Sequence, residues 1–407
     1  MAMYMLDNTI QKYAWGSRVE LPEFLGRANP SGEPWAELWM GAHPKAPSMV
    51  IDQQTGARHA LDSLIAGDPV AMLGQSTAER FSNQLPFLLK VLTASKPLSI
   101  QAHPSKRKAE HGFAREEVAG IPLNAPERNY KDPNHKPETI VAMTQFRGLC
   151  GFRPIEAIIE NVRLLSDKNW ERSLGRLVKN PGKLELSVFL YSFFSALSEQ
   201  QERKFRYIRL RSERIVRDEG RDSPTGLIFS TVLALMDEYP DDLGTLAPLV
   251  LNLFELQPGQ GLNLMAGDAH AYLSGMGVEI MANSDNVLRG GLTHKHVDIP
   301  ELFSVLGFDS YDIEPIIARP GLDGFLTYHC DVPDYSLGRA IIRGRLMVHS
   351  RPLAPEILLC TAGAVSVRAK AVQAIELPRG ASVFIPASER DYELAGDGEV
   401  FRASVPA

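Results

Sequence analysis

Two hydrophobic periodicities divide the chain. In the segment KPLSIQAHPSK (residues 96–106), the apolar residues Leu98, Ile100 and Ala102 alternate with the polar residues Ser99, Gln101 and His103. A period of two predicts a strand whose polar side chains share one face. The apolar segments 85–94 and 138–143 predict further strands, of which the first is buried.

Beyond residue 153 the apolar residues recur at helical spacing. The first stripe consists of Ile155, Ile158, Ile159, Val162 and Leu165. A stronger stripe follows over residues 186–197, and both predict amphipathic helices. Ser198 and Gln201 fit a capping box for another helix, and a fourth helix is expected over 225–237. Residues 154–243 therefore predict a helical domain inserted between β-rich segments.

Strand patterns return in two segments that resemble each other, residues 249–275 and 374–396. Each has an alternating strand, a turn at a proline and a second strand; Pro258 aligns with Pro378, and Tyr272 aligns with Tyr392. Repeated units of this kind build double-sheet jelly rolls, which is the cupin architecture.

The two copies differ where a metal ligand would lie. His270 of the first copy aligns with Arg390 of the second, and an arginine cannot ligate a metal. We therefore predict a mainly β fold with an inserted α-helical domain and two cupin-type jelly rolls, one catalytic and one degenerate. The expected limits are 1–153 plus 244–310 for the catalytic jelly roll, 154–243 for the helical domain and 311–407 for the degenerate one.

Composition narrows the class of protein. A chain of 407 residues with 44% hydrophobic and 23% charged residues has the profile of a globular protein of two or three domains. The net charge of −6 argues against general nucleic-acid binding, which needs a basic surface. The longest apolar run, residues 227–236, is shorter than the ~20 residues that span a bilayer.

The cellular setting is also constrained. The three cysteines, Cys150, Cys330 and Cys360, are far apart and form no CxxC pair, which is typical of a reduced compartment. The first residues show no basic stretch followed by a long apolar one, so no secretory signal is expected. We expect a cytoplasmic protein without nucleic-acid or membrane partners. A monomer is expected, and the sequence leaves a dimer open.

Three segments hold candidate chemistry. Gln101 and His103 point the same way on their predicted strand, as metal ligands of β-barrels often do. In HKPE (135–138), Pro137 holds the chain extended, so that Lys136 and Glu138 share a face. The third segment, 266–295, mixes charges with apolar residues that indicate inward packing, and such charges need partners or a ligand.

Several motifs in a fixed order give the chain a resemblance to one family. They are YAWGS (13–17), AELWMGAHP (36–44), KPLSIQAHP (96–104), NYKDPNHKPE (129–138), CGFRP (150–154), HAYLSG (270–275) and SDNVLRGGLT (284–293). The chain resembles the type I phosphomannose isomerases of the cupin superfamily.

The resemblance implies a site and a reaction. One Zn²⁺ per chain would be held by Gln101, His103, Glu138 and His270. The substrate would be a small phosphosugar, since the family interconverts mannose 6-phosphate and fructose 6-phosphate through a cis-enediol or enediolate. The family's pocket further implies Ser99, Lys136, Glu279, Asp285, Arg289 and Lys295.

The expected roles follow from charge. Arg289 stays protonated and would stabilise the enediolate. Ser99 and Lys295, with Lys96 as an extra contact, would bind the phosphate, and Trp15 would wall the pocket. Glu279 is the expected candidate for the base, with Lys136, Asp285 or a metal-bound water as alternatives.

One departure from the family and two other functions stay open. The family usually has proline where this chain has His294, which also creates a His294-x-His296 pair that we interpret as a surface coincidence. Two histidines and a carboxylate would also suit an iron-dependent cupin oxygenase. The third possibility is a sugar-binding jelly roll without catalysis. A bifunctional nucleotidyltransferase is not expected, because the chain lacks a GxG-rich start.

Overall fold

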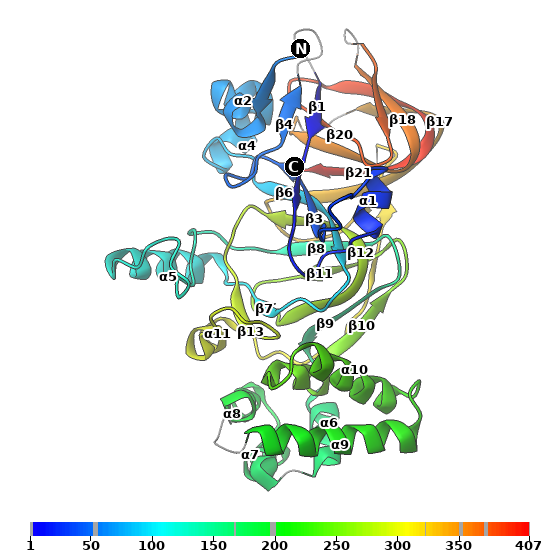
Figure 1. Ribbon diagram of the computed structural model, residues 1–407. Helices are drawn as coiled ribbons and strands as arrows, with labels where there is room; N and C mark the ends of the chain where they lie inside the picture. Colours follow the sequence, from blue (N-terminus) through cyan, green and yellow to red (C-terminus); the bar gives the residue numbers. More distant parts are fainter. Residues whose placement is uncertain are drawn as a thin grey trace.

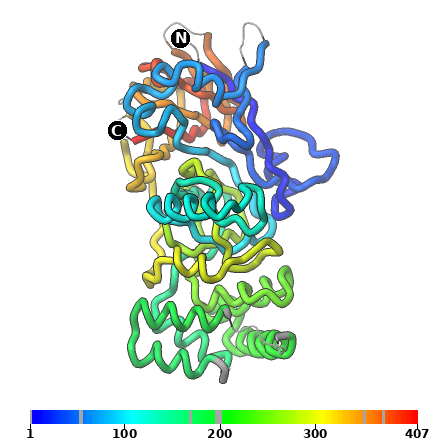
Figure 2. Tube along the Cα trace, turned by 90° about the vertical axis from the view of Figure 1, so that its left-hand side faces the viewer, coloured from blue at the N-terminus to red at the C-terminus, as the bar shows by residue number. Residues whose placement is uncertain are grey.

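The computed structural model describes residues 3–51, 56–166, 168–195, 201–321, 323–349, 353–369 and 373–406. It arranges the chain in three tiers (Figure 1): a helical block at one end, a β unit in the middle, and a second β unit that includes both chain termini. The tube in Figure 2 shows the same order, with the helical block forming one end of an elongated molecule.

The middle unit is an eleven-stranded arrangement that folds into two sheets. One sheet has the order β14-β11-β8-β12-β6-β3-β2, and the other consists of β13, β7, β12, β9 and β10. Their bounds are β2 (Thr9–Gln11), β3 (Glu37–Gly41), β6 (Phe87–Ala94), β7 (Ile100–Ala102), β8 (Glu138–Ala142), β9 (Phe146–Phe152), β10 (Leu251–Leu256), β11 (Gln260–Leu264), β12 (His270–Ala282), β13 (Leu288–Gly291) and β14 (Ile316–Ile317).

The long strand β12 joins these two sheets. Its first residues, 270–274, pair with β7 and β9, and its remainder, 275–282, pairs with β6 and β8. Gly275 lies at the changeover with φ +116, and a Cβ there would lie 2.6 Å from the Gln145 carbonyl oxygen. Glycine is needed at this position because the neighbouring backbone is too close for a side chain.

The C-terminal unit is a second double-sheet jelly roll. Its ten strands are β15 (Arg319–Pro320), β16 (Leu326–Tyr328), β17 (Ser336–His349), β21 (Asp391–Ser404), β18 (Glu356–Ala369), β19 (Ile375–Pro378), β20 (Ser382–Ile385), β1 (Tyr4–Asp7), β4 (Met49–Ile51) and β5 (Arg58–Ala60). The predicted repeat is present: β10, a turn and β11 of the first unit correspond to β19, a turn and β20 of the second. Arg390, the counterpart of His270, is exposed.

The N-terminal strands differ from the expected division. Residues 1–153 were assigned to the catalytic jelly roll, but β1 pairs with β20 of the C-terminal unit, and β4 and β5 extend that sheet. Met3 and Leu6 are buried there. The first segment of the chain thus ties both jelly rolls together, and the exact domain limits stay a prediction.

Five helices and a 3₁₀ turn form the helical block. They are α6 (Ile155–Leu165), α7 (Lys168–Lys179), α8 (Lys183–Ser195), α9 (Gln201–Glu219), α10 (Pro224–Glu238) and η1 (Leu243–Leu249). The expected helix over 225–237 is α10, which begins with Ser223 accepting a hydrogen bond from the Gly226 amide and has Pro224 in its first turn. Ser198 of the predicted capping box lies outside the described residues.

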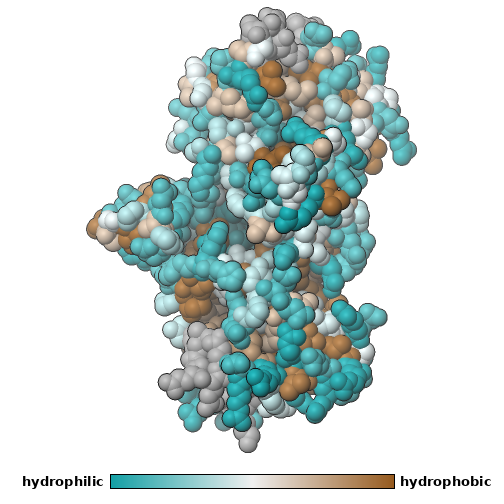
Figure 3. All heavy atoms as spheres, in the orientation of Figure 1, coloured by the Kyte–Doolittle hydropathy of each residue, from teal (hydrophilic) through white to brown (hydrophobic). Residues whose placement is uncertain are grey.

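The remaining helices lie beside the two β units. They are α1 (Glu20–Leu25), α2 (Leu61–Gly67), α3 (Pro69–Leu73), α4 (Gln75–Arg80), α5 (Lys106–Val118) and α11 (Ile299–Val305). Helix α5 projects from the side of the middle unit, and the space-filling view shows it as an arm (Figures 1 and 3). Among the described helices, none is both long and apolar enough to cross a bilayer.

Candidate metal centre and pocket

Strand pairing gathers the candidate residues around Gln101. On β7 this glutamine lies opposite His270 of β12 and opposite Arg289 of β13. Directly opposed residues of neighbouring strands place their side chains on the same face, about 5 Å apart. Gln101, His270 and Arg289 are up to 188 positions apart in sequence. They share one face because the strands pair in this register.

Two histidines and a glutamate converge just below this face. The His103 Nε2 and His270 Nε2 atoms lie 3.5 Å and 3.4 Å from the same oxygen of Glu138, Oε2. All three side chains are buried, and these three atoms have no hydrogen-bond partner. Buried polar atoms of this kind are costly unless something binds them. Within the described part of the chain, this is the one group of three or more His, Cys, Asp or Glu side chains close enough to share an ion.

The other imidazole nitrogens fix the orientation of both rings. The His103 Nδ1–H donates to the Asn286 carbonyl over 2.7 Å, and the His270 Nδ1–H donates to the Asp268 carbonyl over 3.0 Å. A carbonyl can only accept, so Nε2 of each neutral ring carries the lone pair that faces Glu138. Outer hydrogen bonds of this type orient metal-binding histidines. The donor set therefore fits a divalent transition metal.

Protonation at the centre is consistent with ligation. Burial, helped by the Lys136 ammonium, lowers the pKa of His103 to about 4, which keeps the ring neutral. Burial alone would raise the pKa of Glu138, but Lys136 and His103 outweigh it and hold that pKa well below its usual range. Lys136 Nζ lies 2.8 Å from Glu138 Oε1, so Oε2 is left for the metal. Metal ligands must be deprotonated.

A pocket of about 490 Å³ opens over this centre. The predicted residues that line it are Trp15, Ser99, Gln101, Lys136, Glu138, Glu279, Asp285, Arg289 and Lys295. His103 and His270 are fully buried and are not part of the lining. The pocket is large enough for a small substrate with several polar groups.

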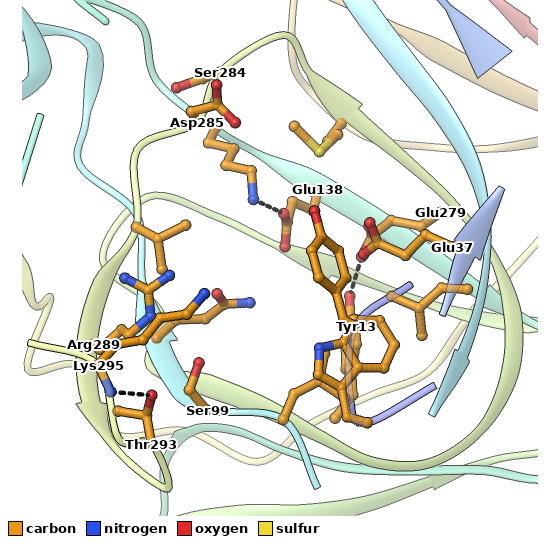
Figure 4. Close-up of a pocket in the computed structure, with 18 of the residues that line it drawn as sticks. Tyr13, Glu37, Ser99, Glu138, Glu279, Ser284, Asp285, Arg289, Thr293 and Lys295 are labelled. Carbon is orange, nitrogen blue, oxygen red and sulfur yellow. Dashed lines mark hydrogen bonds and ion pairs between the residues drawn. The ribbon is translucent and has the colours of Figure 1, made fainter. Parts of the chain in front are cut away.

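The two walls of the pocket carry opposite charges. Figure 4 shows Ser99, Arg289 and Lys295 on one side, and Glu37 and Glu279 on the other, with Glu138 between them. Burial lowers the pKa of Arg289, and burial together with Arg289 lowers the pKa of Lys295. Among the described residues, neither cation forms an ion pair with a carboxylate, and two such cations in one wall are a natural place for an anion.

Sequence reasoning missed Lys90, which lies in the opposite wall. Its ammonium is buried and lies 2.9 Å from Glu279 Oε2 and 3.6 Å from Glu37 Oε1. The Tyr272 hydroxyl donates to the other oxygen of Glu279 over 2.8 Å. A signal was available, because Lys90 is the one charged residue in the apolar segment 85–94, and a charge in a buried strand needs partners.

Burial raises the pKa of Glu279, although the Lys90 ammonium opposes that effect. For Lys90 itself, the attraction of Glu279 and Glu37 together outweighs burial and raises the pKa. Glu37 is further held by the Trp39 indole N–H, which donates to its Oε2 over 2.6 Å. The wall thus contains two carboxylates that share one ammonium.

Lys96 lies outside the pocket, whereas His294 is part of its lining. Lys96, expected to contact phosphate, does not line the pocket; its side chain is 55% exposed and its ammonium pairs with Glu238 at the end of α10, over 2.9 Å. The cause is local, since β7 begins only at Ile100 and the strand alternation does not reach back to Lys96. His294 lies exposed at the pocket edge, and His296 is exposed outside the lining.

The middle unit therefore has the candidate site of a cupin-type metal protein, with candidate ligands from neighbouring strands of a jelly roll and a charged pocket beside them. Residues 3–155 match the family model of the phosphomannose isomerase type I catalytic domain. The chain is 39% identical to mannose-6-phosphate isomerase of Escherichia coli K12 over 98% of this chain and 99% of that protein. It is 34% identical to the human mannose-6-phosphate isomerase, over 95% and 94% of the two chains.

Solved structures agree with the sequence comparisons. A variant of phosphomannose isomerase from Salmonella typhimurium matches all of both chains with a TM-score of 0.91 and 36% identity. A zinc-bound mannose 6-phosphate isomerase matches equally completely, with a TM-score of 0.90 and 36% identity. The chain belongs to the type I phosphomannose isomerase family.

The first prediction tests the metal centre directly. His270→Ala removes one of three convergent ligands, so we expect the purified variant to lose its bound divalent metal, as measured by elemental analysis. His294→Ala serves as the matched control and keeps the metal, because this exposed ring is not in the cluster. A His270→Ala protein that retains stoichiometric metal would remove His270 from the ligand set.

Proposed function

We propose that the protein is a zinc-dependent aldose–ketose isomerase that interconverts mannose 6-phosphate and fructose 6-phosphate through a cis-enediol or enediolate. One observation supports this most strongly. Three buried ligand atoms without partners lie beneath a pocket whose far side holds the close pair Arg289 and Lys295. The family membership and the zinc-bound structure of a relative support the same activity.

The zinc site would consist of His103, Glu138 and His270, with the amide oxygen of Gln101 as fourth ligand. Three neutral ligands and one carboxylate leave a net positive charge, so a bound zinc would act as a Lewis acid on the sugar oxygens. Lys136 holds the second oxygen of Glu138 and so fixes the orientation of that carboxylate. Both histidine side chains are fully buried and so are shielded from solvent.

The cationic wall would bind the charges of the substrate. Lys295 and Ser99 are placed to anchor the phosphate, and Arg289 stabilises the oxygen that becomes negative in the enediolate. A guanidinium remains protonated at neutral pH, so Arg289 acts as a fixed charge and not as a base. Because Lys96 pairs with Glu238 outside the pocket, we leave it out of the phosphate site.

The opposite wall can accept the proton that leaves the sugar carbon. Glu37 and Glu279 share the single ammonium of Lys90. When Glu279 takes up a proton, Lys90 still has Glu37 as its partner, so no unpaired buried charge is created. The raised pKa of Glu279 makes its carboxylate a stronger base. Lys136 and Asp285, the alternatives, are paired with Glu138 and Lys45.

The wider context remains part of the proposal. We propose that the enzyme works in the cytoplasm as a monomer, with one zinc per chain, in carbohydrate metabolism that supplies GDP-mannose. We also propose the three domains given above, with the strands β1, β4 and β5 of the first segment joining the sheet of the C-terminal unit.

The direct test is a coupled assay that converts mannose 6-phosphate to fructose 6-phosphate. We expect saturable turnover by the purified protein, loss of turnover after chelation and recovery on addition of zinc. Saturable binding without turnover would favour the sugar-binding alternative. Stoichiometric iron together with oxygen consumption would favour the oxygenase.

The role of Arg289 gives the next prediction. Arg289→Ala is expected to lower kcat by about 100-fold or more, the usual effect of removing one preorganised charge-stabilising donor, while the metal content stays unchanged. Arg147→Ala, at a partly exposed arginine outside this pocket, is the matched control. Near-normal turnover of Arg289→Ala would exclude its proposed role.

Glu279 is tested by its pH profile. A base must be deprotonated, so kcat/KM of the parent enzyme is expected to fall as the pH falls through the raised pKa of Glu279. Glu279→Gln is expected to lose about 100-fold or more in kcat and to lose this acidic limb. Glu37→Gln also removes one negative charge that pairs with the Lys90 ammonium. This variant is expected to keep the acidic limb of the pH profile. If both variants lose the limb equally, the base lies elsewhere.

A further inference from the structure

The loop that presents Lys295 starts in a backbone conformation that its sequence does not favour. At the end of β13, Gly291 has φ +137, and the next residue, Leu292, has φ +53 although it is not a glycine. Leu292 is buried in the core shared with the helical block. Non-glycine residues rarely adopt this left-handed region unless their surroundings hold them there. The conformation of the loop therefore depends on what packs against it.

The helical block supplies those surroundings. A Cβ on Gly291 would lie 2.8 Å from Asp242 Oδ1 and 2.8 Å from the Gly244 Cα, and a Cβ on Gly244 would lie 2.9 Å from the Leu292 amide nitrogen. The two backbones thus meet at a pair of glycines with no room for a side chain. Asp242 lies in the connection after α10, where it is the N-cap of η1, and Gly244 lies in the first turn of η1.

Asp242 uses its two carboxylate oxygens for different purposes. Oδ1 accepts a hydrogen bond from the Gly244 amide over 2.7 Å and so caps η1. Oδ2 accepts one from the Thr293 amide over 3.2 Å, across to the loop. The Thr293 hydroxyl oxygen in turn accepts a hydrogen bond from the Lys295 backbone amide over 3.1 Å, which is the contact drawn in Figure 4. A chain of contacts therefore runs from Asp242 to the backbone of Lys295.

A second contact ties the same connection to the other phosphate candidate. The Tyr239 hydroxyl donates to the Pro97 carbonyl over 2.7 Å, two residues before Ser99. Tyr239 also lines the pocket. The segment 239–242 thus touches both chain segments from which the anion-binding side chains come.

We propose that Asp242 is a positioning residue for the anion-binding end of the pocket, acting through the Thr293 amide on Lys295. This inference rests on the proposed function, because it assumes that Lys295 binds the substrate phosphate. It assigns to the helical block a part in substrate affinity. Asp242 itself does not line the substrate pocket.

Simple electrostatics predicts the opposite effect of neutralising Asp242 on phosphate binding. Asp242 is an anion near a site for an anion, so neutralising it should strengthen phosphate binding if charge alone mattered. If Asp242 positions the loop, its neutralisation weakens phosphate binding instead. The two explanations therefore differ in the direction of the effect.

The experiment uses Asp242→Asn in the zinc-loaded, full-length enzyme. Asparagine is a good N-cap, so its oxygen can keep the Gly244 contact, while its NH₂ group would face the Thr293 amide, which is also a donor. We expect KM for mannose 6-phosphate to rise about tenfold with kcat within about threefold, since a small misplacement of a binding group costs affinity. The inhibition constant of inorganic phosphate, the probe ligand, should rise in parallel.

Asp241→Asn is the matched control, because it makes the same charge change one residue earlier. Asp241 has φ +66, and asparagine tolerates that region, so the control is expected to fold. It should leave KM and the phosphate inhibition constant unchanged or lower them slightly. Metal content and melting temperature of both variants are measured alongside.

The outcomes separate the inference from the function on which it rests. If the parent enzyme does not turn over mannose 6-phosphate, the proposed function fails. If it does, and Asp242→Asn has an unchanged or lower KM, the positioning role is wrong. The variant could instead lose kcat together with metal or melting temperature, without a parallel rise of KM and of the phosphate inhibition constant. That result would show a general structural role and would also overturn the positioning role.

Discussion

The buried carboxylate of Glu138 is the constraint around which the middle unit is organised. A carboxylate inside a jelly roll is strongly unfavourable unless cations or ligands surround it. Here Lys136 takes one oxygen, and two imidazole nitrogens without other partners face the second. The three protein groups come from β7, β8 and β12 or their immediate ends, so the sheet must be fully formed before the cluster exists. Folding and site formation are thus one event in this unit.

Glu138 lies between the cationic and the acidic walls of the pocket (Figure 4). On one side, Arg289 is held opposite Gln101 by strand pairing, and Lys295 follows in a loop whose backbone depends on the helical block. On the other side, Glu37 and Glu279 share Lys90 inside the sheet β3-β6-β12. The strands therefore carry the acidic wall and the candidate metal ligands, while the cationic wall depends partly on a contact with the helical block. Under the proposed function, such a division would let substrate affinity change without disturbing the metal site.

Local patterns predicted what depends on local geometry. The alternation at 98–103 predicted a strand, which is β7, and the helical stripes predicted α6 and α8, because both signals need only a few neighbouring residues. Gln101 lines the pocket, and His103 belongs to the buried cluster. The pairing of β1 with β20 joins residues 4–6 to residues 382–384, and no local pattern contains that information. Lys96 was expected in the pocket because it lies close to this strand in sequence, but the pairing of its ammonium with Glu238 of the helical block is a long-range contact that no local pattern contains. Lys90 was missed although a lone charge in an apolar strand was visible.

The second jelly roll contains a cluster of a tyrosine, a glutamate and a cation that resembles one wall of the pocket in the first. There the Tyr392 hydroxyl donates to Glu356 over 2.5 Å, and Arg402 lies 3.7 Å from the same carboxylate, much as Tyr272, Glu279 and Lys90 are arranged in the first unit. Both copies thus retain a buried tyrosine that donates to a buried glutamate. The cation beside the glutamate is buried in the first copy and partly exposed in the second. In the second copy Arg390 stands where the first has His270, and the Tyr392 cluster is buried among side chains of the jelly-roll core. A tyrosine–glutamate–cation cluster is therefore a structural device of this fold in itself. In the first unit it becomes part of a reaction site because a metal centre and a pocket lie beside it.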